Sequence, residues 1–124
     1  MAAWTSDELD KIGTADELQI ESLRRDGTLR KPVTIWVVRR GDDLYVRSVN
    51  GRESAWFRGT QDQGEGRIHA GGVDKDVTFV EPGNNIEADL DAAFRTKYGH
   101  YDAQYVDPMV APPAQSAALK LVPR

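Results

Sequence analysis

The sequence of 124 residues contains no cysteine, which excludes disulfides, thiolate metal sites and cysteine nucleophiles. It also lacks any apolar run near the ~20 residues that a membrane-spanning helix needs. The N-terminus, MAAWTSDELDKIG, has neither the basic start nor the apolar stretch of a secretory signal. We therefore expect a soluble, cytoplasmic protein with no membrane partner.

Residue types that often carry catalysis are scarce as well. The two histidines, His69 and His100, have no metal-ligand spacing, and no carboxylate pattern completes a metal site around them. The chain has no G-x-S-x-G serine motif, no phosphate-binding loop and no dinucleotide fingerprint. We expect no metal, and an enzyme with this sequence would take its reactivity from a bound cofactor.

The charge of the chain is unevenly distributed. A net charge of -4 and a pI near 5.1 argue against nucleic-acid binding, which needs a basic face. Residues 24–67 nevertheless carry ten Lys and Arg against six acidic residues. These cations are either scattered in solvent along strand edges or gathered around an anionic ligand. Arg30 and Lys31 fit the first alternative, as edge charges that discourage aggregation.

Residues 1–124 have the length of a single domain. Residues 5–13 begin with a capping box and predict a short helix. Residues 18–27 change from a helical to an alternating pattern and end in a turn. Residues 31–40, KPVTIWVVRR, are β-branched and almost continuously apolar, which predicts one central strand covered on both faces. Residues 44–49 alternate and predict its hairpin partner.

The second half of the chain predicts more strands and one good helix. In order we expect a short helix, a hairpin, a longer helix, a proline-rich connection and a closing strand, at residues 53–61, 66–82, 84–99, 107–116 and 117–124. Leu121–Arg124 also spell a common protease-tag remnant, but the alternation of Leu119 and Leu121 favours natural sequence. Short strands joined in hairpins predict a small closed or half-open barrel with helices at its ends.

Two stretches resemble a known group of proteins. Residues 26–59, DGTLRKPVTIWVVRRGDDLYVRSVNGRESAWFRG, and residues 66–79, GRIHAGGVDKDVTF, resemble the split barrels related to pyridoxamine-phosphate oxidases and deazaflavin-dependent nitroreductases. More closely, nearly the whole chain resembles a bacterial domain of unknown function, DUF2255. The resemblance implies a mainly β (α+β) fold, a small antiparallel split β-barrel of about six strands. An N-terminal helix, a short rim helix and one longer helix would accompany it.

In the split-barrel relatives, the strand after the hairpin and the loop beyond it hold the phosphate and ring of a flavin or deazaflavin. The resemblance therefore implies FMN or a deazaflavin as cofactor, a small-molecule ligand and a homodimer. Carried over to this chain, it gives a cofactor site of Trp36, Arg47, Ser48, Asn50, Arg52, Trp56 and Arg58. The arginines would hold the anionic part of the cofactor, because their planar fork suits phosphate or carboxylate.

The residues themselves leave alternatives open. Trp36 either packs in the core or lies against a ring system, and Trp56 either anchors its helical turn or contacts the ligand. Arg47 lies between apolar residues and must reach either solvent or an anion. Three functions are compatible with the sequence: a flavin- or deazaflavin-dependent oxidoreductase, a cofactor-free protein that binds a small molecule or promotes its rearrangement or cyclisation, and a structural dimerisation module.

Overall fold

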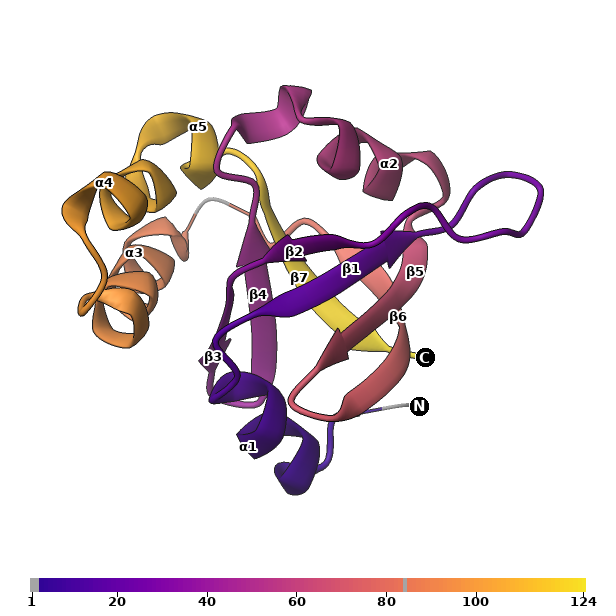
Figure 1. Cartoon of the computed structure of the whole chain (residues 1–124), viewed down its shortest axis with the longest axis horizontal. Helices are drawn as coiled ribbons and strands as arrows, with labels where there is room; N and C mark the ends of the chain where they lie inside the picture. Colours follow the sequence, from indigo (N-terminus) through magenta and orange to yellow (C-terminus); the bar gives the residue numbers. More distant parts are fainter. Residues whose placement is uncertain (1–2, 84) are drawn as a thin grey trace.

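The computed structural model describes residues 3–83 and 85–124, and these form one antiparallel sheet curled into a barrel with helices around it (Figure 1). The strands are β1 (Leu18–Ser22), β2 (Val33–Ile35), β3 (Val37–Arg40), β4 (Asp43–Arg47), β5 (Glu65–Ala70), β6 (Val73–Val80) and β7 (Ala118–Pro123). The helices are α1 (Ser6–Gly13), α2 (Ala55–Gln63), α3 (Glu87–Tyr98), α4 (Ala103–Val106) and α5 (Pro112–Gln115), with 3₁₀ turns η1 (Gly51–Glu53) and η2 (Asp107–Val110). The predicted mainly β split barrel is confirmed.

The two ends of the sheet are connected by the chain and not by hydrogen bonds, so the barrel is split along one side. The strand order is β2-β1-β5-β6-β7-β4-β3, so the two end strands of the sheet follow each other in sequence with only Trp36 between them. The single central strand expected over residues 31–40 is therefore wrong, and the sheet has seven strands in its described part instead of about six. The apolar run has another cause: Val37 packs inside the barrel, whereas Val38 is covered by α3 on the outside.

Two apolar clusters hold the structure together. The first fills the barrel with inward-facing strand residues such as Leu18, Ile68 and Leu119, and α1 and α2 close its two ends (Figure 1). The second lies outside, where Phe94 and Tyr98 of α3 pack on the outer face of β3 and β4. Strands β3 and β4 therefore bury apolar side chains on both of their faces, one inside the barrel and one under α3.

Local signals explain the first helix and the closing strand. The capping box at α1 forms as predicted, because Thr5 and Glu8 each accept the other's backbone N–H. Residues 121–123 lie in β7, between β4 and β6, with Leu121 paired to Leu44 and Phe79. The start expected for the longer helix, at residue 84, lies outside the described residues, and α3 begins at Glu87. None of the helices in the described ranges is long and apolar enough to cross a membrane.

The proline-rich segment is not the plain connection that the sequence predicts. It folds into η2 and α5, directly after α4, and the prolines stand at the first positions of these short elements. Proline is well suited to a first helical position because its missing N–H would have no partner there. Its η2 part packs against α3 and, together with α4, lines the cleft described next.

Candidate functional site

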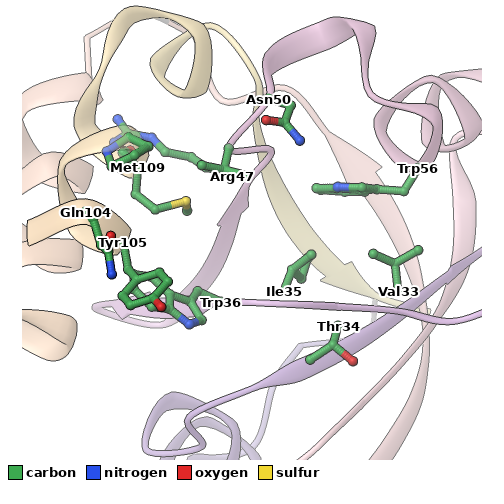
Figure 2. A pocket seen from close by; sticks show the side chains of 12 residues that line it. Val33, Thr34, Ile35, Trp36, Arg47, Asn50, Trp56, Gln104, Tyr105 and Met109 are labelled. Carbon is green, nitrogen blue, oxygen red and sulfur yellow. The ribbon is translucent and has the colours of Figure 1, made fainter. Parts of the chain in front are cut away.

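A cleft of about 450 Å³ opens between the split side of the barrel and the α4–η2 segment (Figure 2). This volume is within the usual range for small-molecule sites. The lining residues are Val33, Thr34, Ile35, Trp36, Arg47, Val49, Asn50, Trp56, Gln104, Tyr105, Pro108 and Met109. They are mostly apolar or aromatic, with a few polar groups that could orient a ligand.

Four of the seven predicted site residues come together at this cleft: Trp36, Arg47, Asn50 and Trp56. Trp36 leaves the strand at the break between β2 and β3, and Trp56 is held by α2 on the opposite side (Figure 2). Both indole rings are half-buried. The break in the strand is thus what turns Trp36 toward the opening.

The other three predicted residues lie outside the cleft lining. Ser48 is buried, and its hydroxyl is 2.7 Å from the Ser54 hydroxyl. Arg52 donates to the two carboxylate oxygens of Glu81 at 2.6 and 3.1 Å, a bond that lowers the pKa of Glu81. Arg58 is exposed on α2. Contact with a cofactor stays a prediction for all seven residues.

Arg47 has an internal anion. Its side chain is 0% exposed and donates to the Asp91 carboxylate at 2.6 Å, to the Met109 carbonyl at 3.0 Å and to the Glu87 carbonyl at 3.1 Å. Figure 2 shows its guanidinium turned toward Met109 and away from Trp56. Its Nε–H is buried without a partner in the described residues. Arg47 therefore joins β4 to α3 and η2 and lines the cleft with its stem. The three predicted arginines do not converge on one point.

A second hollow of about 320 Å³, which we call the basic hollow, adjoins the cleft. Both are lined by Val33 and Trp56, so the Trp56 side chain forms part of the wall between them. The other residues of the basic hollow are Ile20, Ser22, Arg24, Arg30, Lys31, Ala55 and Thr60. Three cations thus lie beside an aromatic cleft. Sequence reasoning treated Arg30 and Lys31 as edge charges, although the basic excess of residues 24–67 was a signal for them.

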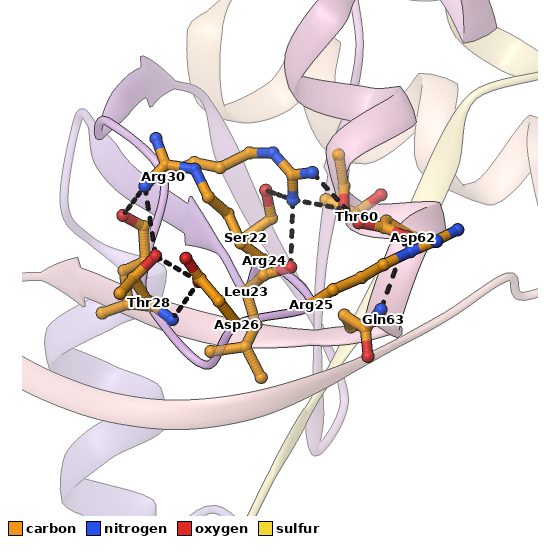
Figure 3. A network of polar contacts seen from close by, with 12 residues as sticks. Ser22, Leu23, Arg24, Arg25, Asp26, Thr28, Arg30, Thr60, Asp62 and Gln63 are labelled. Carbon is orange, nitrogen blue, oxygen red and sulfur yellow. Dashed lines mark hydrogen bonds and ion pairs between the residues drawn. The ribbon is translucent and has the colours of Figure 1, made fainter.

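The loop that supplies these cations is held in place by polar contacts (Figure 3). Arg30 donates to the Leu23 carbonyl at 3.0 Å, to the Gly59 carbonyl at 3.3 Å and to Asp62 at 3.1 Å, which ties the loop to α2. The hydrogen bond from Arg30 lowers the pKa of Asp62 and outweighs burial, which raises it, so the pKa lies below its usual value. Lys31 has no hydrogen-bond or ion-pair partner among residues 3–83 and 85–124, so its ammonium is available to an anion.

The sequence profile of one family, described as an uncharacterized protein conserved in bacteria (DUF2255), matches residues 8–121. This chain belongs to that family. The match covers every strand of the barrel except the end of β7, in agreement with the resemblance seen in the sequence. No curated protein matches the chain.

Solved structures with the same fold include three related to this chain at low identity. An "F420 Reductase" is 9% identical with a TM-score of 0.60, and the match covers 94% of this chain and 90% of that one. The conserved hypothetical protein Rv2991 from Mycobacterium tuberculosis is 11% identical with a TM-score of 0.67, over 98% and 81%. A FAD-binding protein from Mesorhizobium loti is 14% identical with a TM-score of 0.60, over 99% and 92%. At these identities the likeness shows a shared fold.

Proposed function

We propose that the protein binds a flavin or deazaflavin and uses it in an oxidoreduction of a small molecule. The observation that carries this proposal is the adjacency of an aromatic cleft and a basic hollow across Trp56. A cofactor with a flat ring and an anionic tail needs those two environments side by side. The similar folds named "F420 Reductase" and FAD-binding protein support the same ligand class.

The cleft suits the ring of such a cofactor. Trp36 and Trp56 offer aromatic faces, and Ile35 and Met109 add apolar surface. Asn50 and Gln104 can donate or accept hydrogen bonds at the edge of a ring. These residues would bind the ring and exclude water from it, whereas the cofactor itself would supply the hydride or electron chemistry.

The basic hollow suits the anionic tail. Arg24 and Lys31 are exposed there, and Arg30 lies behind them with its charge partly balanced by Asp62. We therefore propose the three cations of the basic hollow as the ligands of a phosphate or carboxylate. They take the role that the sequence predicted for Arg47, Arg52 and Arg58. Arginine and lysine both bind such groups, arginine through its fork and lysine as a point charge.

Ligand titration tests the proposal. We expect purified protein to bind FMN or the deazaflavin cofactor saturably, read from the quenching of flavin and tryptophan fluorescence. Trp56→Ala should weaken binding by about 2 kcal/mol through lost stacking and burial, roughly thirtyfold in Kd. Lys31→Ala should weaken it by about 1 kcal/mol, roughly fivefold in Kd. Arg95 is exposed on α3 and lines neither hollow, so Arg95→Ala removes the same charge and should leave Kd unchanged.

The absence of saturable binding to either compound would remove the proposal. Loss of affinity in Arg95→Ala equal to that in Lys31→Ala would mean that net charge acts, not the basic hollow.

A second candidate is a cofactor-free protein that binds a flat, uncharged molecule. It is favoured by one observation: the cation that lines the cleft itself, Arg47, is already balanced by Asp91. A neutral ligand would then occupy the cleft and leave the basic hollow unused. Mass spectrometry of ligands that co-purify with the protein distinguishes the two, because an anionic ligand sensitive to Lys31→Ala fits only the first.

A further inference from the structure

Three aromatic side chains form a continuous stack beside the cleft. The Trp36 and Tyr98 rings are parallel, with centroids 4.0 Å apart and an interplanar angle of 1°. The Tyr101 ring centroid is 5.5 Å from that of Trp36 and 6.2 Å from that of Tyr98. Trp36 therefore contacts both tyrosines, one buried and one near the surface.

The two ends of this stack face different environments. Trp36 lines the cleft, where it is half-buried. Tyr98 is fully buried, whereas 37% of Tyr101 is exposed. The stack thus connects the proposed binding cleft to the outer surface of the protein. A packing role alone would account for Tyr98, which belongs to the outer apolar cluster, but it does not explain the exposed end.

The two tyrosines differ in what accepts their phenol proton. Tyr101 donates to the Asp16 carboxylate at 2.6 Å. The Tyr98 hydroxyl is 2.8 Å from the Asp16 carbonyl and 3.0 Å from the Val37 carbonyl, and neither group is a base. The Lys97 ammonium also lies 5.0 Å from the centre of the Tyr98 ring, where its charge opposes loss of an electron. A phenol gives up an electron most easily when its proton can leave with it, so Tyr101 is the more oxidisable of the two.

We propose that Trp36 and Tyr101 form a relay that carries single electrons between the cleft and the surface, with Tyr98 holding the Trp36 ring in place and Asp16 as the proton acceptor. A one-electron oxidant in the cleft takes an electron from the Trp36 indole and is reduced by one electron. The Trp36 radical cation then takes an electron from Tyr101, which returns the indole to its neutral state. The Tyr101 phenol proton passes to the Asp16 carboxylate, leaving a neutral phenoxyl radical. A soluble thiol or ascorbate then gives the phenoxyl radical one hydrogen atom, that is one electron and one proton, which restores Tyr101, and the Asp16 carboxyl releases its proton to solvent.

The relay is a property of these side chains and does not depend on which cofactor the cleft holds. It would remove oxidising equivalents from the cleft before they damage the groups that line it, such as the Met109 thioether. It would also allow a reductant too large for the cleft to act from outside.

Pulse radiolysis of the protein without added cofactor tests this proposal. Azide radicals oxidise tryptophan, and transfer to tyrosine is followed as the indolyl absorption decays and the phenoxyl absorption rises. We expect a first-order phase whose rate is independent of protein concentration, as intramolecular transfer requires. Trp36→Phe and Tyr101→Phe should each remove this phase. In the parent protein the phase should be slower in D₂O, because the phenol proton moves with the electron. Asp16→Asn should slow the phase at least about tenfold, about 1.4 kcal/mol in activation free energy, and should remove this isotope effect.

Two comparisons make the result specific. Trp4→Phe removes a tryptophan whose indole N–H is held by the Leu121 carbonyl, outside the stack, and should leave the phase intact. Tyr45→Phe removes a tyrosine of β4 that lines neither hollow and does not stack on Trp36 among the described residues, and it should also leave the phase intact. Each variant keeps an aromatic ring, and its circular dichroism should match that of the parent protein. The relay is overturned if the phase survives in Trp36→Phe or in Tyr101→Phe.

Discussion

Replacing Arg47 with methionine tests how strongly the wall of the cleft depends on one buried charge. The Arg47 side chain is 0% exposed and that of Asp91 is 26% exposed. Methionine fills much of the same space with a flexible apolar chain, so the cavity left behind is small. The loss is then mainly that of the ion pair and of the bonds to the carbonyls of Glu87 and Met109.

The structure predicts different costs for the two halves of this pair. Removing one partner of a buried ion pair costs about 3–5 kcal/mol. In Arg47→Met the remaining charge is on Asp91, which still reaches solvent and accepts a bond from the Gln115 amide at 2.9 Å. We therefore expect the lower end, about 3 kcal/mol. In Asp91→Asn the remaining charge is the enclosed guanidinium, so we expect the upper end, about 5 kcal/mol.

Urea unfolding followed by circular dichroism measures these costs in the parent protein, in both single variants and in the double variant. The double variant should lose less stability than the sum of the single ones, because neither charge is left unbalanced. The reasoning is refuted if Arg47→Met costs less than about 1 kcal/mol, the value typical of an exposed pair. It is also refuted if the order of the two single variants is reversed.

Three further outcomes can be measured with the same protein. Hydrogen bonds to Asp74 and to Glu21 outweigh burial and raise the pKa of His69 above 6.5, so this stabilisation is fully present below pH 6.5 and is lost as the pH rises through the raised value. Urea midpoints should fall across that interval, and His69→Asn should flatten the fall; an unchanged slope in the variant would contradict this. Gly66→Ala should destabilise the fold by more than about 2 kcal/mol, because a Cβ there would lie 2.2 Å from the Glu21 carbonyl oxygen. At Gly59 a Cβ would lie 2.6 Å from the Ser22 hydroxyl, a side-chain atom and not backbone, and alanine favours the helix, so Gly59→Ala should lower the urea midpoint less than Gly66→Ala, and the reverse order would contradict this. Light scattering should give the mass of a homodimer, as the split-barrel resemblance implies, and a monomer at micromolar concentration would exclude that proposal.

The barrel could be predicted because most of its signals are local. Alternation marks β5, β6 and β7, the capping box marks α1, and the apolar stripe marks α3. None of these patterns reports which strands become neighbours. Residues 31–40 look like one strand because neighbouring positions are apolar for different reasons: Val37 lies inside the barrel, and Val38 lies outside under α3. The division into two strands depends on contacts with α3, which local pattern does not contain.

The site was predictable in its aromatic part and not in its charges. Residue order alone places Trp36 and Trp56 near one opening once the fold is known. The partner of Arg47 is Asp91, 44 residues further along the chain, and no spacing rule selects it among the acidic residues of α3. In the same way, Lys31 and Arg24 gain a role only because the loop between β1 and β2 folds against α2. Ion pairing depends on the tertiary structure, so the sequence alone could not show which arginines are paired with acidic residues and which are free.

One helix covers the free edge of β3 beside the cleft. The Val37 N–H donates to the Tyr98 hydroxyl at 3.1 Å, and the Lys97 ammonium donates to the Val37 carbonyl at 2.6 Å. These are the backbone groups that a further strand would need, so side chains of α3 occupy the free edge of β3. The same Tyr98 ring supports Trp36 from behind, at 4.0 Å. A single residue separates β2 from β3, too few for a hairpin turn, so the two strands do not pair with each other, and Trp36 between them, supported by Tyr98, lines the aromatic cleft.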